Sequence, residues 1–256
     1  EWASAALRAG KHVLCEKALA ANAEEARQLI LLARTRGLLL MEGLAFFHHP
    51  LFEQMRAVLA SGELGVVERV DSSFVVGASK YKQKGSRYDS SMAGGASADL
   101  GGYVLSGMFV AMLGVWPSID FATALTWAKD KMIDEVVSGN ASFPTGARGS
   151  FHWSLRGRRT GSLLSVHGSL GRLEATDFQA PHQRSSGFTV RRNSLESYRV
   201  QGTKLSNMTS YAHQLLAFAH LARGGINSMA AIGPLGSTGS SPLLLAAALD
   251  DVYESA

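Results

Sequence analysis

Residues 1–45 alternate between helical and extended segments, and this order limits the folds that the chain can adopt. Residues 2–9 have a helical pattern closed by Gly10, and the apolar run KHVLCE that follows is typical of a short buried strand. A second helix is expected between the cap residue Asn22 and Gly37, and LLLMEG then predicts a second buried strand. Because this order is typical of parallel strands joined by crossover helices, the segment is expected to be part of an α/β domain.

The pattern changes after Pro50, where helices and strands no longer alternate. Residues 121–200 contain repeated short strands separated by Gly, Asn and Ser, and GSLLSVHGSLGRLEAT has the pattern of a hairpin, so a mostly antiparallel sheet is expected. The other predicted segments are a helix from Leu51 to Gly65, a strand over 66–76, a basic loop over 77–97, helices over 99–113 and 211–223, a Gly/Ser-rich stretch over 226–241 and a last helix from Ser241. Residues 46–256 therefore predict an α+β domain built on one large sheet.

Composition excludes several classes of protein. Cys15 is the one cysteine among 256 residues, so no internal disulfide can form and a reducing, cytoplasmic setting is expected. No apolar run approaches the roughly 18 residues that a membrane span needs. The eight histidines show no metal-ligand spacing with Cys or Glu, so no metal site is predicted.

The formal charge of +4 comes with local clusters of basic residues. We interpret them as solvated loops and strand faces, because no aromatic interleaving or recognisable module accompanies them, and nucleic acid is not expected as a partner. The clustered residues are Lys80, Lys82, Lys84 and Arg87, then Arg148, Arg156, Arg158 and Arg159, then Arg191 and Arg192.

A charged pair, Glu16 and Lys17, follows the first predicted strand directly. Ligands of open parallel sheets bind beyond the carboxyl ends of the strands. A lysine placed there can orient a carbonyl or alcohol and stabilise negative charge on its oxygen. The simpler interpretation is a surface ion pair at a strand–helix junction.

The stretch GGASADLGGYVLSG places Asp99 and Tyr103 four residues apart, on one face of a predicted helix. Three glycines in this helix predict close backbone approach to a neighbour or a ligand. A nearby Lys⁺ is expected to lower the pKa of the tyrosine, so that Lys, Asp and Tyr together can move a proton to or from a substrate hydroxyl. The alternative is an Asp cap followed by a core tyrosine.

Taken together, these segments resemble one family over essentially the whole chain. AGKHVLCEK, MEGLAFFHHPLFEQMRAVLASGELGVVERV, GGASADLGGY and the two closing helices are similar to the glucose–fructose oxidoreductase and inositol dehydrogenase (Gfo/Idh/MocA) family. The resemblance implies that residues 1–45 are a partial dinucleotide-binding (Rossmann) domain without its first βαβ part. It also implies that residues 46–256 form a substrate and oligomerisation domain with a large, open, mostly antiparallel sheet.

The resemblance also implies residue roles. Lys17 matches the catalytic lysine that hydrogen-bonds the substrate oxygen near the nicotinamide, with Glu16 beside it at the cofactor, and Tyr103 matches the proton donor and acceptor with Asp99 as its helper. The Asp–Tyr spacing is similar to the branch containing dihydrodiol dehydrogenases and NADP-dependent xylose dehydrogenases. On a predicted strand, His152 and Trp153 are candidates to line the sheet face that holds substrate.

The implied activity is hydride transfer between NADP or NAD and the CH–OH group of a sugar, such as D-xylose, or of a trans-dihydrodiol, by a homodimer formed through the sheet domain. The chain departs from the family at Ala18, where proline is usual, and at Phe47, where arginine is common in this branch. It also contains no G-x-G-x-x-G loop, so we expect roughly 80 upstream residues to be missing. The alternative is a non-catalytic, truncated remnant that serves as a binding or assembly module.

Overall fold

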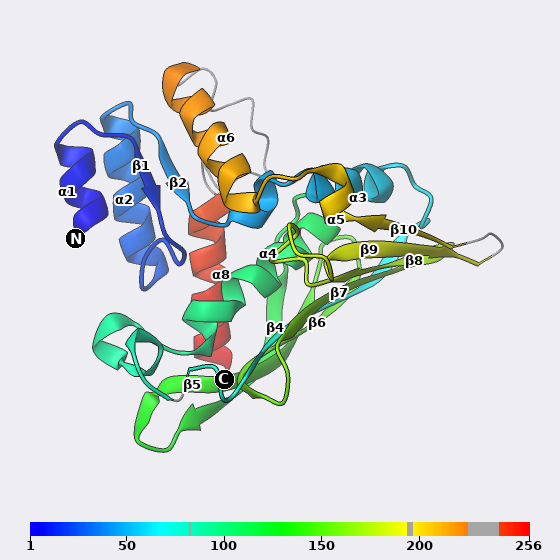
Figure 1. Cartoon of the computed structure of the whole chain (residues 1–256). Helices are drawn as coiled ribbons and strands as arrows, with labels where there is room; N and C mark the ends of the chain where they lie inside the picture. Colours follow the sequence, from blue (N-terminus) through cyan, green and yellow to red (C-terminus); the bar gives the residue numbers. More distant parts are fainter. Residues whose placement is uncertain (82, 194–196, 225–240) are drawn as a thin grey trace.

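The computed structural model describes residues 1–81, 83–193, 197–224 and 241–256 (Figure 1). Lys82 and residues 226–240 of the predicted Gly/Ser-rich stretch lie outside the described residues. In the described part of the chain, no helix has the length and apolar character required to cross a membrane.

The N-terminal part is a two-stranded parallel sheet with helices beside it, which confirms the predicted alternation (Figure 1). Its elements are α1 (Trp2–Arg8), β1 (Val13–Cys15), α2 (Ala23–Thr35) and β2 (Leu40–Glu42). The side chain of Asn22 accepts a hydrogen bond from the Glu25 amide at 2.9 Å, so it caps α2 as predicted. Both strands are short, and Cys15 pairs with Glu42 at their common carboxyl end.

The rest of the chain is built on an eight-stranded sheet in the order β10-β9-β8-β7-β3-β6-β5-β4. All neighbouring strands are antiparallel except β3 and β6, which confirms the expected mostly antiparallel open sheet. The strands are β3 (Val67–Gly77), β4 (Ser118–Trp127), β5 (Asp130–Ser142), β6 (Arg148–Gly157), β7 (Gly161–Gly168), β8 (Gly171–Thr176), β9 (Gly187–Arg192) and β10 (Tyr198–Gln201).

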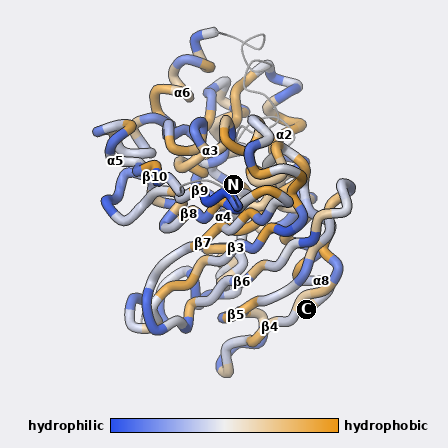
Figure 2. The backbone as a smooth tube through the Cα atoms, turned by 90° about the vertical axis from the view of Figure 1, so that its right-hand side faces the viewer, coloured by the Kyte–Doolittle hydropathy of each residue, from blue (hydrophilic) through white to orange (hydrophobic). Residues whose placement is uncertain are grey.

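Helices lie on one face of this sheet, and its strands alternate between hydrophobic and hydrophilic residues (Figures 1 and 2). In β3, for example, Val70 and Phe74 are buried while Arg69 is exposed, because successive side chains of a strand point to opposite faces. The helical elements between β2 and residue 97 are η1 (Ala45–His48), α3 (Pro50–Ala60), η2 (Ser86–Tyr88) and η3 (Ser90–Met92). The closing helices are α5 (Gly202–Leu205), α6 (Ser210–Gly224) and α8 (Ser241–Ser255).

The helix predicted over 99–113 begins earlier and ends sooner. It starts with a π-helical turn, η4 (Ser97–Gly101), and continues as α4 (Gly102–Ala111). The expected close approach of this helix to a neighbour is confirmed at Gly101, and the neighbour is protein. A Cβ on Gly101 would lie 2.7 Å from Leu249 Cδ2 and 3.3 Å from the ring of Trp153. Close packing against α8 and β6 therefore requires a residue without a side chain there.

The start of η4 is fastened to the sheet by buried hydrogen bonds. Asp134 of β5 accepts from both the backbone amide and the hydroxyl of Ser97, at 2.8 and 2.9 Å. The indole of Trp153 donates to the same hydroxyl at 3.0 Å. Since these groups are all buried, the position of η4 is set by the strands beneath it.

The C-terminal helices return to the N-terminal part. Leu243 and Ala246 of α8 join the apolar cluster of α1, α2 and the two short strands, and Leu221 of α6 packs against Leu39 and Met41. The predicted domain boundary at residue 45 stays a prediction. The two apolar clusters named above contain residues from both sides of it.

Candidate active site

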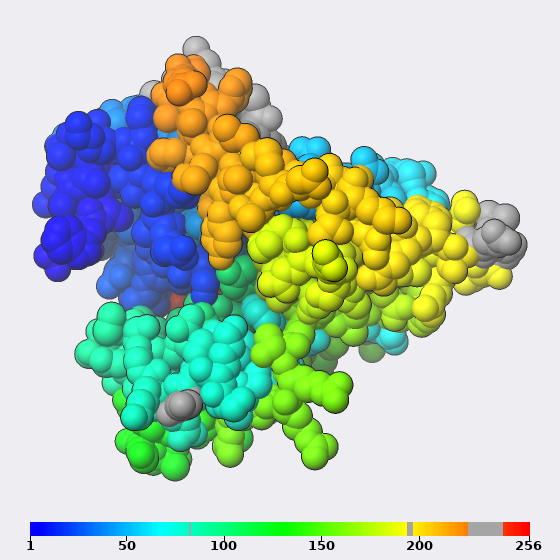
Figure 3. Space-filling view, in the orientation of Figure 1, coloured from blue at the N-terminus to red at the C-terminus, as the bar shows by residue number. Residues whose placement is uncertain are grey.

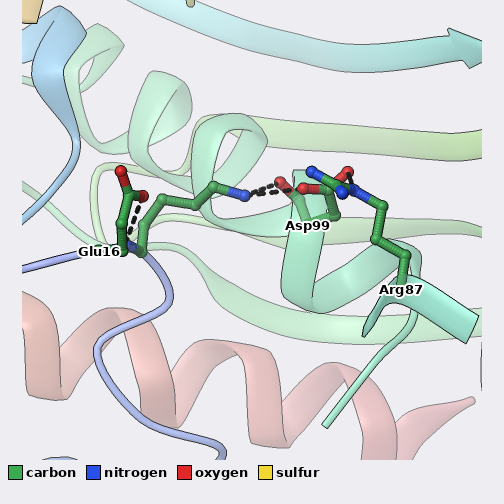
Figure 4. Close-up of polar contacts among 4 residues, drawn as sticks. Glu16, Arg87 and Asp99 are labelled. Atoms are coloured by element: carbon green, nitrogen blue, oxygen red, sulfur yellow. Dashed lines mark hydrogen bonds and ion pairs between the residues drawn. The ribbon is translucent and has the colours of Figure 1, made fainter. Parts of the chain in front are cut away.

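Lys17 reaches from the end of β1 to the start of the helix on the large sheet. Its ammonium nitrogen Nζ lies 2.9 Å from Asp99 Oδ1 and 2.7 Å from the Asp99 carbonyl oxygen (Figure 4). The simpler interpretation, a surface ion pair between Lys17 and Glu16, does not describe this contact. The Glu16 carboxylate instead accepts a hydrogen bond from the backbone amide of Lys17 at 3.2 Å. The peptide bond between Lys17 and Ala18 is cis.

The Asp99 carboxylate is held by two cations. Its Oδ2 accepts from Arg87 Nε at 2.6 Å, while Oδ1 accepts from Lys17, and the side chain is 8% exposed (Figure 4). Burial raises the pKa of this carboxyl, but the hydrogen bonds and positive charges of Arg87 and Lys17 outweigh burial and hold the pKa below its usual range. Asp99 is therefore ionised at neutral pH, and it is not the helix cap of the alternative interpretation.

Tyr103 lies one turn after Asp99, with Lys17 Nζ 5.3 Å from its ring centroid. Its ring also packs against Phe46 and Phe74, with centroids 5.6 Å away in both cases. The expectation that Lys17 would lower the tyrosine pKa is wrong. Burial raises the pKa of Tyr103, and nearby Tyr211 and Asp99 raise it further, so the phenol keeps its proton at neutral pH.

The site also contains a buried carboxyl, close enough to Lys17 to feel its charge, that was not predicted from the sequence. Glu42 ends β2, is 2% exposed and accepts from the Leu19 amide at 3.0 Å through Oε1. Burial raises the pKa of Glu42 to about 7, against the opposing effects of the Leu19 hydrogen bond and the charge of Lys17. The available signal was an acidic residue at the carboxyl end of an otherwise apolar strand.

Two further residues of the site come from the basic loop between β3 and η4. Arg87 contacts Asp99 as described, and its guanidinium carbon lies 4.2 Å from the ring centroid of Tyr81. In the space-filling view, a recess separates the N-terminal part from the teal lobe that includes this loop (Figure 3). The sequence indicated only a cluster of basic residues in this loop. Its local pattern does not show which of them forms an ion pair with a carboxylate elsewhere in the chain.

His152 and Trp153, the two candidates to line the sheet face that holds substrate, do not lie on a common face of the sheet. As neighbours on β6, they point to opposite faces of the sheet. Trp153 is fully buried and supports Ser97 through its indole. The His152 ring lies on the open face, where Nδ1 is 2.8 Å from the Ser138 hydroxyl, away from the face that carries Asp99.

The chain's residues fit the nicotinamide half of a dinucleotide better than the phosphate half. A cation and a partly protonated carboxyl stand at the common carboxyl end of two parallel strands, the place where such sheets bind ligands. No G-x-G-x-x-G sequence is available to hold a pyrophosphate. Among the described residues, no group of three or more His, Cys, Asp or Glu could hold a metal ion.

Comparison with known protein families gives two matches. Residues 52–174 match the GFO/IDH/MocA C-terminal domain. Residues 1–44 match the oxidoreductase family with an NAD-binding Rossmann fold.

Individual relatives agree with these matches. The chain is 33% identical over 171 residues to trans-1,2-dihydrobenzene-1,2-diol dehydrogenase of Sus scrofa, covering 67% of this chain and 49% of the relative. It is 33% identical over 149 residues to D-xylose 1-dehydrogenase (NADP(+)) of Hypocrea jecorina, covering 56% of this chain and 36% of the relative. The chain thus spans less than half the length of either curated relative.

A solved structure covers almost all of the chain. KijD10, a 3-ketoreductase from Actinomadura kijaniata crystallised with NADP and TDP-benzene, superposes with a TM-score of 0.83 at 25% sequence identity. The superposition covers 99% of this chain and 74% of that one.

Proposed function

The chain belongs to the Gfo/Idh/MocA family of NAD(P)-dependent oxidoreductases, and from this premise we propose that its site transfers hydride between NADP or NAD and a CH–OH carbon of a sugar or a trans-dihydrodiol. The observation that carries the proposal is the meeting of Lys17, Asp99 and Tyr103 at the carboxyl end of β1. An amine, a carboxylate and a phenol from distant positions in the sequence gather where a nicotinamide and a reacting alcohol would lie side by side.

In the proposed reaction the nicotinamide ring accepts or donates the hydride, and the protein binds and orients the substrate oxygen. The Lys17 ammonium has three N–H groups, and Asp99 accepts from two of them. The third has no acceptor in the described part of the chain and is the group that would donate to the substrate oxygen. Such a bond stabilises the negative charge that develops on that oxygen.

Tyr103 supplies the proton in the direction of carbonyl reduction. Because its phenol is protonated at neutral pH, it can donate to the substrate oxygen as hydride arrives at the carbon. In the direction of alcohol oxidation, the phenol oxygen of Tyr103 must first lose its own proton before it can accept the proton of the substrate hydroxyl. Glu16 lies beside Lys17 on the exposed side and is proposed to contact the cofactor.

The substrate class rests on the relatives and on the walls of the site. The named relatives act on a trans-dihydrodiol and on D-xylose, both of which carry adjacent hydroxyl groups. Phe47, stacked on Phe46 with centroids 4.4 Å apart, extends the aromatic cluster that packs on Tyr103. Apolar rings next to a hydrogen-bonding centre suit either a diol ring or the face of a sugar.

The test compares the chain with a form extended at its N-terminus by the sequence encoded directly upstream. NADP⁺ reduction is followed with D-xylose and with trans-1,2-dihydrobenzene-1,2-diol. We expect turnover by the extended form, and losses on the order of 10²–10⁴-fold in kcat for Lys17→Met and Tyr103→Phe. Lys11→Met is the control, because Lys11 is exposed and precedes β1, at the end of the strand opposite to Lys17.

Unchanged rates in Lys17→Met and Tyr103→Phe would remove the proposed roles. If neither form turns over and neither binds NADPH in a fluorescence titration, the second candidate function, a non-catalytic binding or assembly module, replaces this one. The absence of a glycine-rich phosphate loop from the sequence is what favours that alternative.

We also propose that the protein works in the cytoplasm as a homodimer formed through the open face of the large sheet. That face exposes Phe121, Leu125 and Leu163 at 53%, 52% and 39% among polar neighbours, and apolar side chains in such a setting suit an interface. Light scattering should give twice the chain mass, and Leu163→Asp should halve it. A monomer for the unmutated chain contradicts the assembly. Fractionation of cells would test the compartment.

A further inference from the structure

Arg87 occupies a place that the proposed reaction does not by itself require. It lies in η2, in the loop between β3 and η4, and its Nε donates to Asp99 Oδ2 at 2.6 Å. The opposite oxygen, Oδ1, accepts from Lys17 at 2.9 Å (Figure 4). One nearly buried carboxylate is therefore shared by two cations, each on its own oxygen, and the cluster carries one excess positive charge.

Arg87 is itself held firmly in this place. Its guanidinium carbon lies 4.2 Å from the ring centroid of Tyr81, a distance typical of cation–π stacking. Its carbonyl oxygen accepts from the Gly95 amide at 2.9 Å, just before η4 begins. Both the side chain and the backbone of Arg87 are thus fixed relative to the turn that carries Asp99.

The geometry has a consequence for the lysine. With Oδ2 taken by Arg87, the ammonium of Lys17 bonds Oδ1 and the Asp99 carbonyl, and one N–H stays available within the described residues. Without Arg87, the carboxylate could rotate about its Cβ–Cγ bond and offer both oxygens to Lys17. The lysine would then be drawn toward Asp99 and away from a substrate oxygen.

We propose that Arg87 is a positioning residue that holds one oxygen of Asp99 so that Lys17 keeps a free N–H for the substrate. Tyr81 supports it by stacking on the guanidinium. This inference rests on the proposed function for its kinetic consequence, whereas the coupling between Arg87 and Asp99 can be measured without turnover.

The kinetic test uses the N-terminally extended form and the variants Arg87→Met, Arg87→Lys, Asp99→Asn and the double variant Arg87→Met/Asp99→Asn. Arg87→Met should lower kcat on the order of 10- to 100-fold with little change in KM, since a small displacement of a reacting group has this effect. Arg87→Lys should recover part of the loss. The double variant should be no slower than Asp99→Asn alone, because Arg87 acts through the carboxylate.

The matched control is Arg69→Met, which removes an arginine whose Nε lies 2.8 Å from the Asp71 carboxylate, outside the proposed site. It should leave kcat unchanged. Circular dichroism melting of each variant separates loss of folding from loss of positioning. Should Arg87→Met fail to fold, the comparison of Arg87→Lys with the unmutated protein carries the test.

The second readout is the titration of the Asp99 carboxyl carbon by NMR, recorded on the chain as printed. Loss of the Arg87 charge and hydrogen bond should raise the pKa of Asp99, whereas Arg69→Met should leave it in place. An unchanged titration in Arg87→Met overturns the inference, and so does a loss of kcat as large in the Asp99→Asn background as in the unmutated one. Absence of turnover in every form would reject the proposed function instead, and the titration would still decide the Arg87–Asp99 coupling.

Discussion

Among single residues, Tyr103 has the environment that departs most from what its sequence neighbours indicate. A cation stands 5.3 Å from its ring centroid, yet burial dominates and the pKa of the phenol is raised. The attraction of Lys17 for a phenolate can be expected from the sequence, whereas the hydration that Tyr103 loses on burial cannot. In a site packed with aromatic rings, desolvation opposes the charged form of the tyrosine more strongly than one lysine, already paired with Asp99, favours it.

This raised pKa predicts different pH profiles for the two directions of the proposed reaction. Alcohol oxidation needs a deprotonated acceptor, so its rate should climb with pH through the alkaline range, while carbonyl reduction, which uses the protonated phenol, should stay level near neutrality. Both profiles are measured as kcat against pH on the N-terminally extended form. Tyr103→Phe should abolish the alkaline rise, and a rise that survives this substitution would assign it to another group.

At the scale of secondary-structure elements, the site depends on how closely the ends of β1 and β2 approach. The Gly43 amide donates to the Cys15 carbonyl oxygen at 2.6 Å, and this contact fixes the segment that carries Lys17. A Cβ on Gly43 would lie 3.0 Å from that oxygen, 3.2 Å from Glu16 Cα and 3.4 Å from the Lys17 amide nitrogen. All three neighbours are backbone atoms, which yield less easily than the end of a side chain.

Gly43→Ala should therefore displace the Lys17 segment by a few tenths of an ångström and lower kcat by roughly 10-fold, because the reacting groups lose alignment. The matched control is Gly102→Ala, where the new Cβ would meet Leu245 Cδ2 at 3.7 Å, an ordinary contact. Steady-state kinetics and thermal melting of both variants make the comparison. Equal kinetics in the two variants would mean that the strand ends tolerate the extra methyl group.

At the scale of the whole molecule, Glu42 links folding to pH. Its pKa is raised from an ordinary value of 4.5 to about 7 in the folded protein, so the folded state binds more protons between these values than the unfolded state does. The stability that this group contributes is fully present below about pH 4.5 and is lost as the pH rises through about 7. The free energy of unfolding should accordingly fall across this window.

Glu42→Gln keeps an oxygen for the Leu19 amide but cannot ionise, so it should flatten this fall. The measurement is urea unfolding of the chain at several pH values between 4.5 and 8. Glu24→Gln, at an exposed position that pairs with Arg27, is the control and should keep the slope of the unmutated chain. The same slope in Glu42→Gln would assign the pH dependence to other groups.

The order and type of most elements could be predicted from local patterns of residues. Asn22 as a cap, Gly37 as a stop, and the change from helical to two-residue periodicity act within a few residues, so they can be read without knowing the fold. The parallel pairing of the two N-terminal strands and the mostly antiparallel large sheet followed from the same local patterns.

Which groups meet, and in what environment, depends on how the folded chain packs. The contact of Arg87 with Asp99, the burial of Glu42 and Trp153 and the raised pKa of Tyr103 depend on segments that are far apart in the chain. Turns and strands are set by short-range sterics and hydrogen bonds, whereas charge pairing and desolvation depend on distances that packing alone fixes. Lys17 was found by its place at a strand end, but its partner 82 positions away became visible only when the chain was folded.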